Sequence, residues 1–171
     1  MFELFGKLKF SEGNVPLLPG DILCVKRKRD CYRHFGVYIG RGRVVHYAAT
    51  HGDFDKHEDA TVHISSLEGF LRKEKTYYRV EIREGKGYTI FSPEKTVERA
   101  LSRLGEHSYS ILTNNCEHFA LWCRTGISES CQVEKCIGEA LLTVPMVAMP
   151  LFLPVRAAGL AITIHPVPRP F

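Results

Sequence analysis

A cysteine stands where a short helix is predicted to begin, within residues 113–120 (TNNCEHFA). Asn114 and Asn115 precede Cys116, and asparagine is a preferred N-cap residue. The helix is expected to bury one face and to end at Gly126, since apolar residues recur at helical spacing at Cys116, Phe119, Ala120 and Cys123. The positive end of a helix favours thiolate over thiol, and the thiolate is the nucleophile. The pattern therefore indicates a nucleophilic Cys116, with a buried structural cysteine as the alternative.

Two histidines lie on a predicted β-hairpin upstream of this cysteine. Residues 34–40 (HFGVYIG) and 43–47 (RVVHY) are short runs of β-branched and aromatic residues. Glycines between two such runs are typical of a hairpin turn. His34 opens the first run and His46 lies near the end of the second, so both are candidates to share a site with the cysteine.

The hairpin register decides whether these histidines can cooperate. With a three-residue loop, Ile39 pairs with Arg43 and Gly36 lies opposite His46. His34 and His46 then become diagonal neighbours on one face, roughly 7–8 Å apart between backbones. A two-residue loop would place them on opposite faces. A shared histidine site therefore requires the longer loop, in which Gly36 would leave room beside His46 for a side chain or a substrate.

The three side chains together form the cysteine and histidine version of a nucleophilic triad. Cys116 is the predicted nucleophile and His34 the general base. His46 is the predicted orienting residue, because a neutral imidazole is suited to fixing the tautomer of its neighbour. Any one of these histidines alone would more often be a structural residue, and it is the combination that indicates catalysis.

The composition indicates one globular domain of ordinary character. The chain has 171 residues and a formal net charge of +4. This charge is compatible with an anionic membrane surface, and it is too small to indicate nucleic acid without a recognition motif. Residues 1–20 show no secretory signal pattern, and six cysteines without paired spacing are expected to be reduced and cytosolic.

Strands are predicted at residues 21–25 and 77–83, the second with Tyr78, Val80 and Ile82 on one face. A helix is predicted to begin at residues 92–94 and to stop at Gly105. Its buried stripe would contain Val97, Ala100, Leu101 and Leu104.

Two polar segments have weaker functional interpretations. The basic residues 26–30 (KRKRD) are expected to form a solvated loop, with contact to a phosphate headgroup as the functional alternative. The acidic and histidine-rich residues 51–63 fit no strong zinc or calcium spacing. We predict neither a metal nor a cofactor.

The composition changes sharply after Cys136. Residues 140–155 contain no charge, and residues 140–164 contain only Arg156. The run approaches membrane-spanning length, but it is interrupted by Pro145, Pro150 and Pro154, each of which kinks a helix. We predict a kinked or re-entrant membrane segment, with a tail packed on the domain as the alternative. The predicted division is a catalytic domain at 1–136, a hydrophobic membrane-associating segment at 137–164 and a flexible tail at 165–171.

Several of these motifs resemble one known family. Residues 34–40, Val45 with His46, and residues 114–119 (NNCEHF) look like the signature of the lecithin retinol acyltransferase family. This family includes the phospholipase A/acyltransferases, also called H-Ras-like suppressors. Residues 19–21 (PGD) match as well, and the resemblance extends from about residue 18 to residue 126.

The resemblance implies a permuted papain-like, NlpC-type α+β fold, with an antiparallel sheet and a catalytic-cysteine helix. It implies Cys116 as the nucleophile, His34 as the general base and His46 as the orienting residue. The implied enzyme is a membrane-associated phospholipase A and acyltransferase. It would take a fatty acyl group from a glycerophospholipid as a Cys116 thioester. The acceptor would be water, the amine of phosphatidylethanolamine, a lysophospholipid or retinol. Its expected place is the cytoplasmic face of an intracellular membrane.

Two other classes of function remain open from the sequence. A cysteine peptidase or amidase would use the same residues on a peptide. A non-catalytic membrane adaptor would keep the fold and the hydrophobic segment, and its biological effect would not require Cys116.

Overall fold

The fold is an antiparallel sheet covered on both faces by helices. The computed structural model describes residues 16–27, 32–49, 60–74, 76–83, 88–108, 110, 114–128 and 162–168. In this part of the chain, six strands form the sheet in the order β4-β3-β2-β1-β5-β6. Their bounds are Ile22–Arg27 (β1), Tyr32–Gly40 (β2), Arg43–Ala49 (β3), Ala60–Ser66 (β4), Thr76–Ile82 (β5) and Ile162–Pro168 (β6). The predicted α+β class and antiparallel sheet are confirmed, and the permuted papain-like topology stays a prediction.

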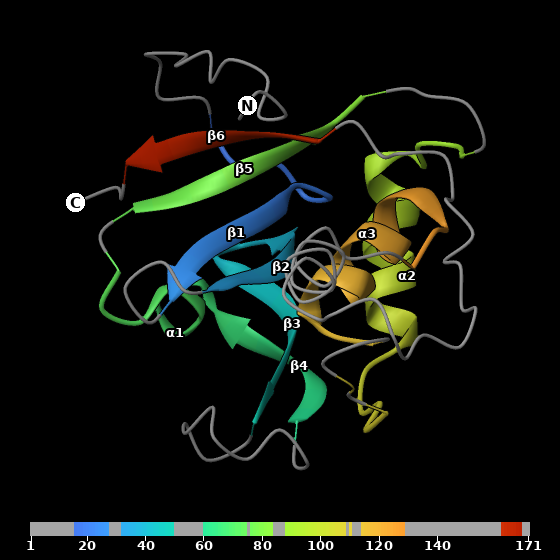
Figure 1. The fold of residues 1–171 in the computed structure, drawn as a ribbon, viewed down its shortest axis with the longest axis horizontal. Helices are drawn as coiled ribbons and strands as arrows, with labels where there is room; N and C mark the ends of the chain where they lie inside the picture. The colour runs from blue at the N-terminus through green and yellow to red at the C-terminus, as the bar shows by residue number, and fades with distance from the viewer. Residues whose placement is uncertain are drawn as a thin grey trace, which may run out of the picture.

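Within the described residues, three helices flank this sheet. Their bounds are Leu67–Leu71 (α1), Pro93–Ser102 (α2) and Cys116–Thr125 (α3). In Figure 1, α2 and α3 lie together on one side of the sheet, whereas α1 lies on the other side near β3 and β4. The strands that carry the two histidines are therefore central, between a helix pair and a single short helix.

Alternation along the strands divides the apolar residues into two clusters, one on each face. The cluster on the α3 face includes Phe35, Val37, Val45, Tyr47, Cys116 and Phe119. The cluster on the α1 face includes Leu23, Val25, Val44, Phe70 and Leu71. Because successive strand residues point to opposite faces, residues of β2 with even numbers face α1 and those with odd numbers face α3.

The hairpin between β2 and β3 has the predicted register but a different turn. Tyr38 pairs with Val44, and this pairing is the one that a three-residue loop requires. The register then shifts, so that Gly40 pairs with Arg43 in place of Ile39. The expected pair of Ile39 with Arg43 is therefore wrong.

A β-bulge explains how this turn still brings the histidines to one face. Only Arg41 and Gly42 lie between the last paired residues, and both have positive φ, of 51° and 64°. A two-residue turn alone would place His34 and His46 on opposite faces. The extra residue of the bulge, Ile39, shifts the strand by one position and restores them to the same face.

Gly36 lies opposite His46 as predicted, but the space beside it is filled. A Cβ added to Gly36 would lie 2.6 Å from Val44 Cγ1, 2.9 Å from Phe70 Cε2 and 3.2 Å from His46 Cβ. The glycine therefore lets the Phe70 ring pack against the strand, so the room predicted here for a side chain or a substrate is occupied by a side chain.

Helix α2 begins as predicted, but its buried face differs. Ser92 is the N-cap and accepts from the backbone N–H of Lys95 at 3.2 Å. Leu101 and Leu104 are 38% and 42% exposed, so their expected burial is wrong. The helix ends at Ser102. Ala100 is fully buried in the core cluster that includes Phe119 and Ala120 of α3, and the Arg99 guanidinium lies 3.7 Å from the centroid of the Trp122 ring.

Strand β5 has the predicted faces, since Tyr78, Val80 and Ile82 all join the cluster on the α3 side. Its outer neighbour is β6, formed by residues 162–168. The boundary predicted at residue 164 therefore falls inside a strand, and the flexibility expected for the tail stays a prediction.

The hydrophobic residues 137–161 lie outside the described residues. Within the part of the chain that the structure describes, no helix has the length and apolar character needed to cross a bilayer.

We expect Gly36→Ala to destabilise the protein by about 1–3 kcal/mol, because the added methyl group overpacks the core. Urea unfolding measures the free-energy change. Val44→Ala removes the atom that the new methyl group would meet first, at 2.6 Å. Gly36→Ala should therefore cost less in the Val44→Ala background, and additive effects of the two substitutions would contradict this packing.

Candidate active site

Helix α3 begins at Cys116 after an asparagine N-cap, as predicted, and the cap is part of a complete capping box. Asn115 is the N-cap, and its Oδ1 accepts from the backbone N–H of Glu117 at 2.9 Å and of His118 at 3.1 Å. The reciprocal hydrogen bond is present as well, because His118 Nδ1 accepts from the backbone N–H of Asn115 at 3.3 Å. The helix ends at Gly126 with a left-handed φ of 79°, also as predicted. These bonds hold Cys116 at the first helical position.

The Cys116 thiol is buried against the backbone of β2. The residue is 5% exposed, and Sγ lies 3.9 Å from the carbonyl oxygen of Arg33. Burial raises the pKa of the thiol to about 12, and the neighbouring Glu117 charge also raises it. A hydrogen bond from the Phe35 N–H lowers the pKa but does not compensate. The helix end therefore does not produce a resting thiolate, and the thiol must lose its proton when it reacts.

The two predicted histidines form a buried hydrogen-bonded pair. His34 Nε2 and His46 Nδ1 are 2.9 Å apart, and the residues are 2% and 4% exposed. Burial lowers the pKa of His34 well below 6.5, and the nearby His46 lowers it further. Burial and then His63 lower the pKa of His46 to about 3. Both imidazoles are therefore neutral at pH 7, and a neutral imidazole is a proton acceptor.

A serine extends the histidine pair by one more hydrogen bond. The second ring nitrogen of His46, Nε2, lies 2.9 Å from Ser65 Oγ on β4. Ser65 pairs with Val44, and His63 pairs with His46, so both β4 residues share the face of the histidines. A continuous line of polar contacts thus crosses β2, β3 and β4.

Helix α1 covers this pair with an aromatic ring. The Phe70 ring lies 5.2 Å from each imidazole centroid, stacked on His34 and edge-on to His46. Arg27 fastens the end of this helix, because its guanidinium donates to the carbonyl oxygen of Leu71 at 2.9 Å and to that of Phe70. Residues 26 and 27 belong to β1 and Arg27 is buried, so the predicted solvated loop is wrong for these two residues, and its remainder at 28–30 lies outside the described residues.

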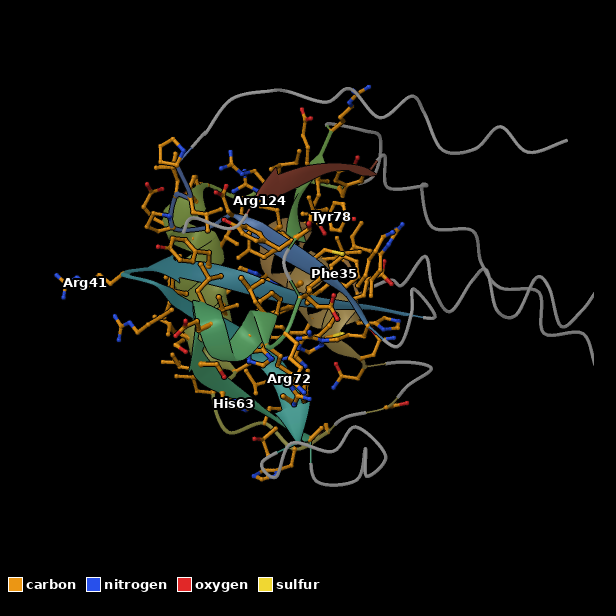
Figure 2. The ribbon with its side chains drawn as sticks, turned by 90° about the vertical axis from the view of Figure 1, so that its left-hand side faces the viewer. Phe35, Arg41, His63, Arg72, Tyr78 and Arg124 are labelled. Carbon is orange, nitrogen blue, oxygen red and sulfur yellow. The ribbon has the colours of Figure 1, made fainter. Side chains whose placement is uncertain are left out.

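The thiol and the imidazole pair lie against different faces of β2. Phe35 packs with Cys116 on the α3 face, whereas His34 is stacked on Phe70 on the α1 face. Figure 2 shows Phe35 within the body of the domain, while Arg41 projects from the end of the hairpin. The structure thus brings the two histidines into contact, and it places the thiol beside the backbone that carries His34.

A second polar network holds the segment before Cys116. The side-chain Nδ2 of Asn114 donates to Glu106 Oε1 at 2.9 Å and to Tyr47 Oη at 3.1 Å. Arg103 and Tyr47 also donate to the Glu106 carboxylate. Burial alone would raise the pKa of Glu106, but the bonds from Arg103, Tyr47 and Asn114 lower it to about 2. This ionised carboxylate ties β3 to the residue two positions before the thiol.

Sequence reasoning missed several residues around the histidines and the cysteine: Ser65, Phe70, Arg27, Tyr47, Arg103 and Glu106. Ser65 and Phe70 approach the histidines only because β4 pairs with β3 and continues into α1. No local pattern distinguishes them from neighbouring serines and aromatic residues, so only the pairing of the strands identifies them.

Among the residues that the structure describes, no group of three or more histidine, cysteine or acidic side chains has the geometry to hold a metal ion. Most of the polar segment 51–63 lies outside those residues, and only its end, 60–63, is described as part of β4.

Comparison with known proteins places this geometry in a family. Residues 16–129 match the family model described as lecithin retinol acyltransferase. The chain is 30% identical over 129 residues to phospholipase A and acyltransferase 1 of Rattus norvegicus, which covers 70% of this chain and 75% of that protein. The chain belongs to the lecithin retinol acyltransferase family.

Two further relatives carry the two enzyme names that occur in this family. Phospholipase A and acyltransferase 3 of Homo sapiens is 28% identical over 130 residues, covering 71% of this chain and 79% of that protein. Lecithin retinol acyltransferase of Rattus norvegicus is 31% identical over 138 residues, covering 69% of this chain but only 58% of that protein. The names of these relatives are those of enzymes, so the family supports phospholipase or acyltransferase chemistry.

We expect alkylation of Cys116 by iodoacetamide to accelerate about tenfold per pH unit between pH 7 and pH 9, because a thiol whose pKa is about 12 gains thiolate throughout that range. The rate is followed by mass spectrometry of the peptide that contains Cys116. A plateau near pH 7 would contradict a resting thiol and would indicate a preformed thiolate paired with an imidazolium.

We expect the free energy of unfolding to fall as the pH drops from 6.5 to 5, by about 1 kcal/mol per buried histidine for each pH unit. The unfolded chain binds protons at His34 and His46 in this range, whereas the folded chain resists them because burial lowers both pKa values. Urea unfolding at several pH values measures the slope. The His34→Gln, His46→Gln double variant should lose most of it, and an unchanged slope would contradict the assignment.

Proposed function

We propose that this protein is a thiol phospholipase A and acyltransferase that carries a fatty acyl group on Cys116. One observation supports the proposal most strongly: a capped, buried thiol lies against the strand that carries a neutral, hydrogen-bonded histidine pair. The names of the relatives supply the reaction class, and the site supplies a nucleophile with a proton acceptor on the neighbouring strand.

The reaction begins with loss of the Cys116 proton. Because Nε2 of His34 bonds His46, the proton goes to Nδ1 of His34. The thiolate attacks the carbonyl carbon of a glycerophospholipid ester, and the lysophospholipid leaves as its oxygen takes the proton from His34. The acyl group is then a thioester on Cys116. Attack by water completes a phospholipase cycle, and attack by an amine or hydroxyl completes an acyl transfer.

Direct proton transfer requires the thiol and Nδ1 to come within hydrogen-bond distance. In the structure the thiol is directed to the Arg33 carbonyl oxygen. Catalytic hydrogen bonds often shorten only when substrate is bound, so we infer that lipid binding draws the His34 ring and Cys116 together. The thiol and the imidazole must approach each other because the raised pKa keeps the Cys116 thiol protonated before substrate binds.

The oxyanion of the tetrahedral intermediate needs a donor close to Cys116. The Asn115 cap occupies the N–H groups of Glu117 and His118. The backbone N–H of Cys116 itself is therefore the candidate donor at the start of α3, where the helix dipole also favours negative charge.

The acyl acceptor and the membrane contact are further parts of the proposal. Water, the amine of phosphatidylethanolamine, a lysophospholipid and retinol are the candidate acceptors. The apolar residues 137–161 would hold the domain on the cytoplasmic face of an intracellular membrane, which raises the local concentration of lipid. Residues 162–164, which the sequence pattern placed in this segment, belong to β6 and are left out of the proposal.

We expect the full chain, incubated with phosphatidylcholine vesicles, to gain the mass of one acyl group on Cys116 and to release lysophosphatidylcholine. Cys116→Ala should show no adduct. His34→Gln should form it about 10²–10⁴-fold more slowly, which is the usual contribution of a general base. Intact-mass analysis measures the adduct, and adding each candidate acceptor in turn then identifies the product.

A negative result would distinguish between the two alternative classes of function, a membrane adaptor and a peptidase or amidase. A folded protein that binds the vesicles but yields neither adduct nor lysophospholipid would exclude the acyl transfer and favour the non-catalytic adaptor. Cleavage of a soluble peptide without lipid, dependent on Cys116, would favour a cysteine peptidase or amidase.

A further inference from the structure

The hydroxyl of Ser65 occupies the far end of the polar line that starts at His34. It lies 2.9 Å from His46 Nε2, and His46 Nδ1 in turn lies 2.9 Å from His34 Nε2. A neutral imidazole carries one proton on its two nitrogens, so one nitrogen donates and the other accepts. The direction of the first bond therefore sets the direction of the second.

Only one direction leaves His34 able to act as a base. If the serine donates to His46 Nε2, then His46 Nδ1 must donate to His34 Nε2. The remaining proton of His34 would then be on Nδ1, and this nitrogen could not take the Cys116 proton. If the serine accepts from His46 Nε2, both bonds reverse, and Nδ1 of His34 is the unprotonated nitrogen.

We propose that Ser65 is a positioning residue that accepts a hydrogen bond from His46 and thereby holds His34 in the tautomer that can deprotonate Cys116. This inference rests on the proposed function for its consequence in catalysis, but the tautomer itself is a property of the protein without substrate. Ser65 touches neither the thiol nor the substrate in this scheme, and it acts only through the two imidazoles.

The surroundings explain why this single hydroxyl has such an effect. His34 and His46 are both buried beneath the Phe70 ring, so each of their polar atoms depends on a protein partner. The ring of His63 lies 4.8 Å from that of His46, between centroids, on the same side of the sheet. The His63 Nδ1 atom faces the Thr61 carbonyl oxygen at 3.3 Å, a bond in which the imidazole must donate. Ser65 is thus the neighbour of His46 whose oxygen is placed to accept from Nε2.

Ser66 offers a matched control, because the same atomic change can be made one residue along the strand. Its hydroxyl accepts from the backbone N–H of Gly69 at 3.0 Å and caps α1. It points to the opposite face from Ser65. Ser66→Ala removes a hydroxyl and weakens a helix cap, but it leaves the line of imidazoles intact.

The test measures the protonation of the ring nitrogens by NMR of the full-length protein with ¹⁵N-labelled histidine at pH 7. In the natural protein and in Ser66→Ala, we expect His34 to carry its proton on Nε2, with Nδ1 unprotonated. Ser65→Ala should shift part of the His34 signal toward the other tautomer, and Ser65→Thr should restore it. Assignment uses His34→Gln and His46→Gln.

Activity supplies the second readout. Ser65→Ala should lower the rate of acyl-enzyme formation about tenfold, because a buried donor loses its acceptor, while Ser65→Thr and Ser66→Ala stay close to the natural rate. An unchanged His34 tautomer in Ser65→Ala would overturn the proposal, whether or not the protein transfers acyl groups. A shifted tautomer in a protein that forms no thioester would instead support the role of Ser65 and reject the proposed function.

Discussion

The hydrogen bond between His34 and His46 is the interaction on which the site depends. It joins two imidazoles that are almost fully buried. Each ring would destabilise the folded state there if its polar atoms had no hydrogen-bond partner. The bond exists only because a bulge at Ile39 offsets a two-residue turn and brings both rings to one face. A register shift of one residue between β2 and β3 would place the two imidazoles on opposite faces of the sheet, where they could not bond each other.

Burial has opposite consequences for the two halves of the site. It removes charge from the imidazoles, which makes them available as bases at neutral pH. It also keeps the Cys116 thiol protonated, so that the cap and dipole of α3 do not yield a thiolate at rest. The proposed reaction therefore resembles that of a serine nucleophile with a histidine base more than that of a preformed ion pair, because in the proposal the proton moves as the bond to carbon forms.

The polar residues around the site differ in how they are supported. Glu106 is ionised and accepts from Arg103, Tyr47 and Asn114, so it can hold the segment before the thiol without changing its charge state. The line from His34 to Ser65 is neutral, and its hydrogen bonds can reverse direction. The first network is suited to fixing position, and the second is suited to moving or orienting a proton.

The sequence by itself determined the local features of this protein. The N-cap asparagine, the first helical position of Cys116 and the glycine stop all follow from interactions within a few residues. The common face of the two histidines depends on the bulge at Ile39, which the residue pattern did not indicate. The family motif indicated the chemistry for a similar reason, because it consists of a few short segments that can each be recognised locally. The tertiary structure alone decided the partners of Phe70, Ser65 and Glu106, and it also placed residues 162–168 in the sheet. Those contacts depend on strand pairing and helix packing across long separations in the chain, where no local spacing records which residues will meet.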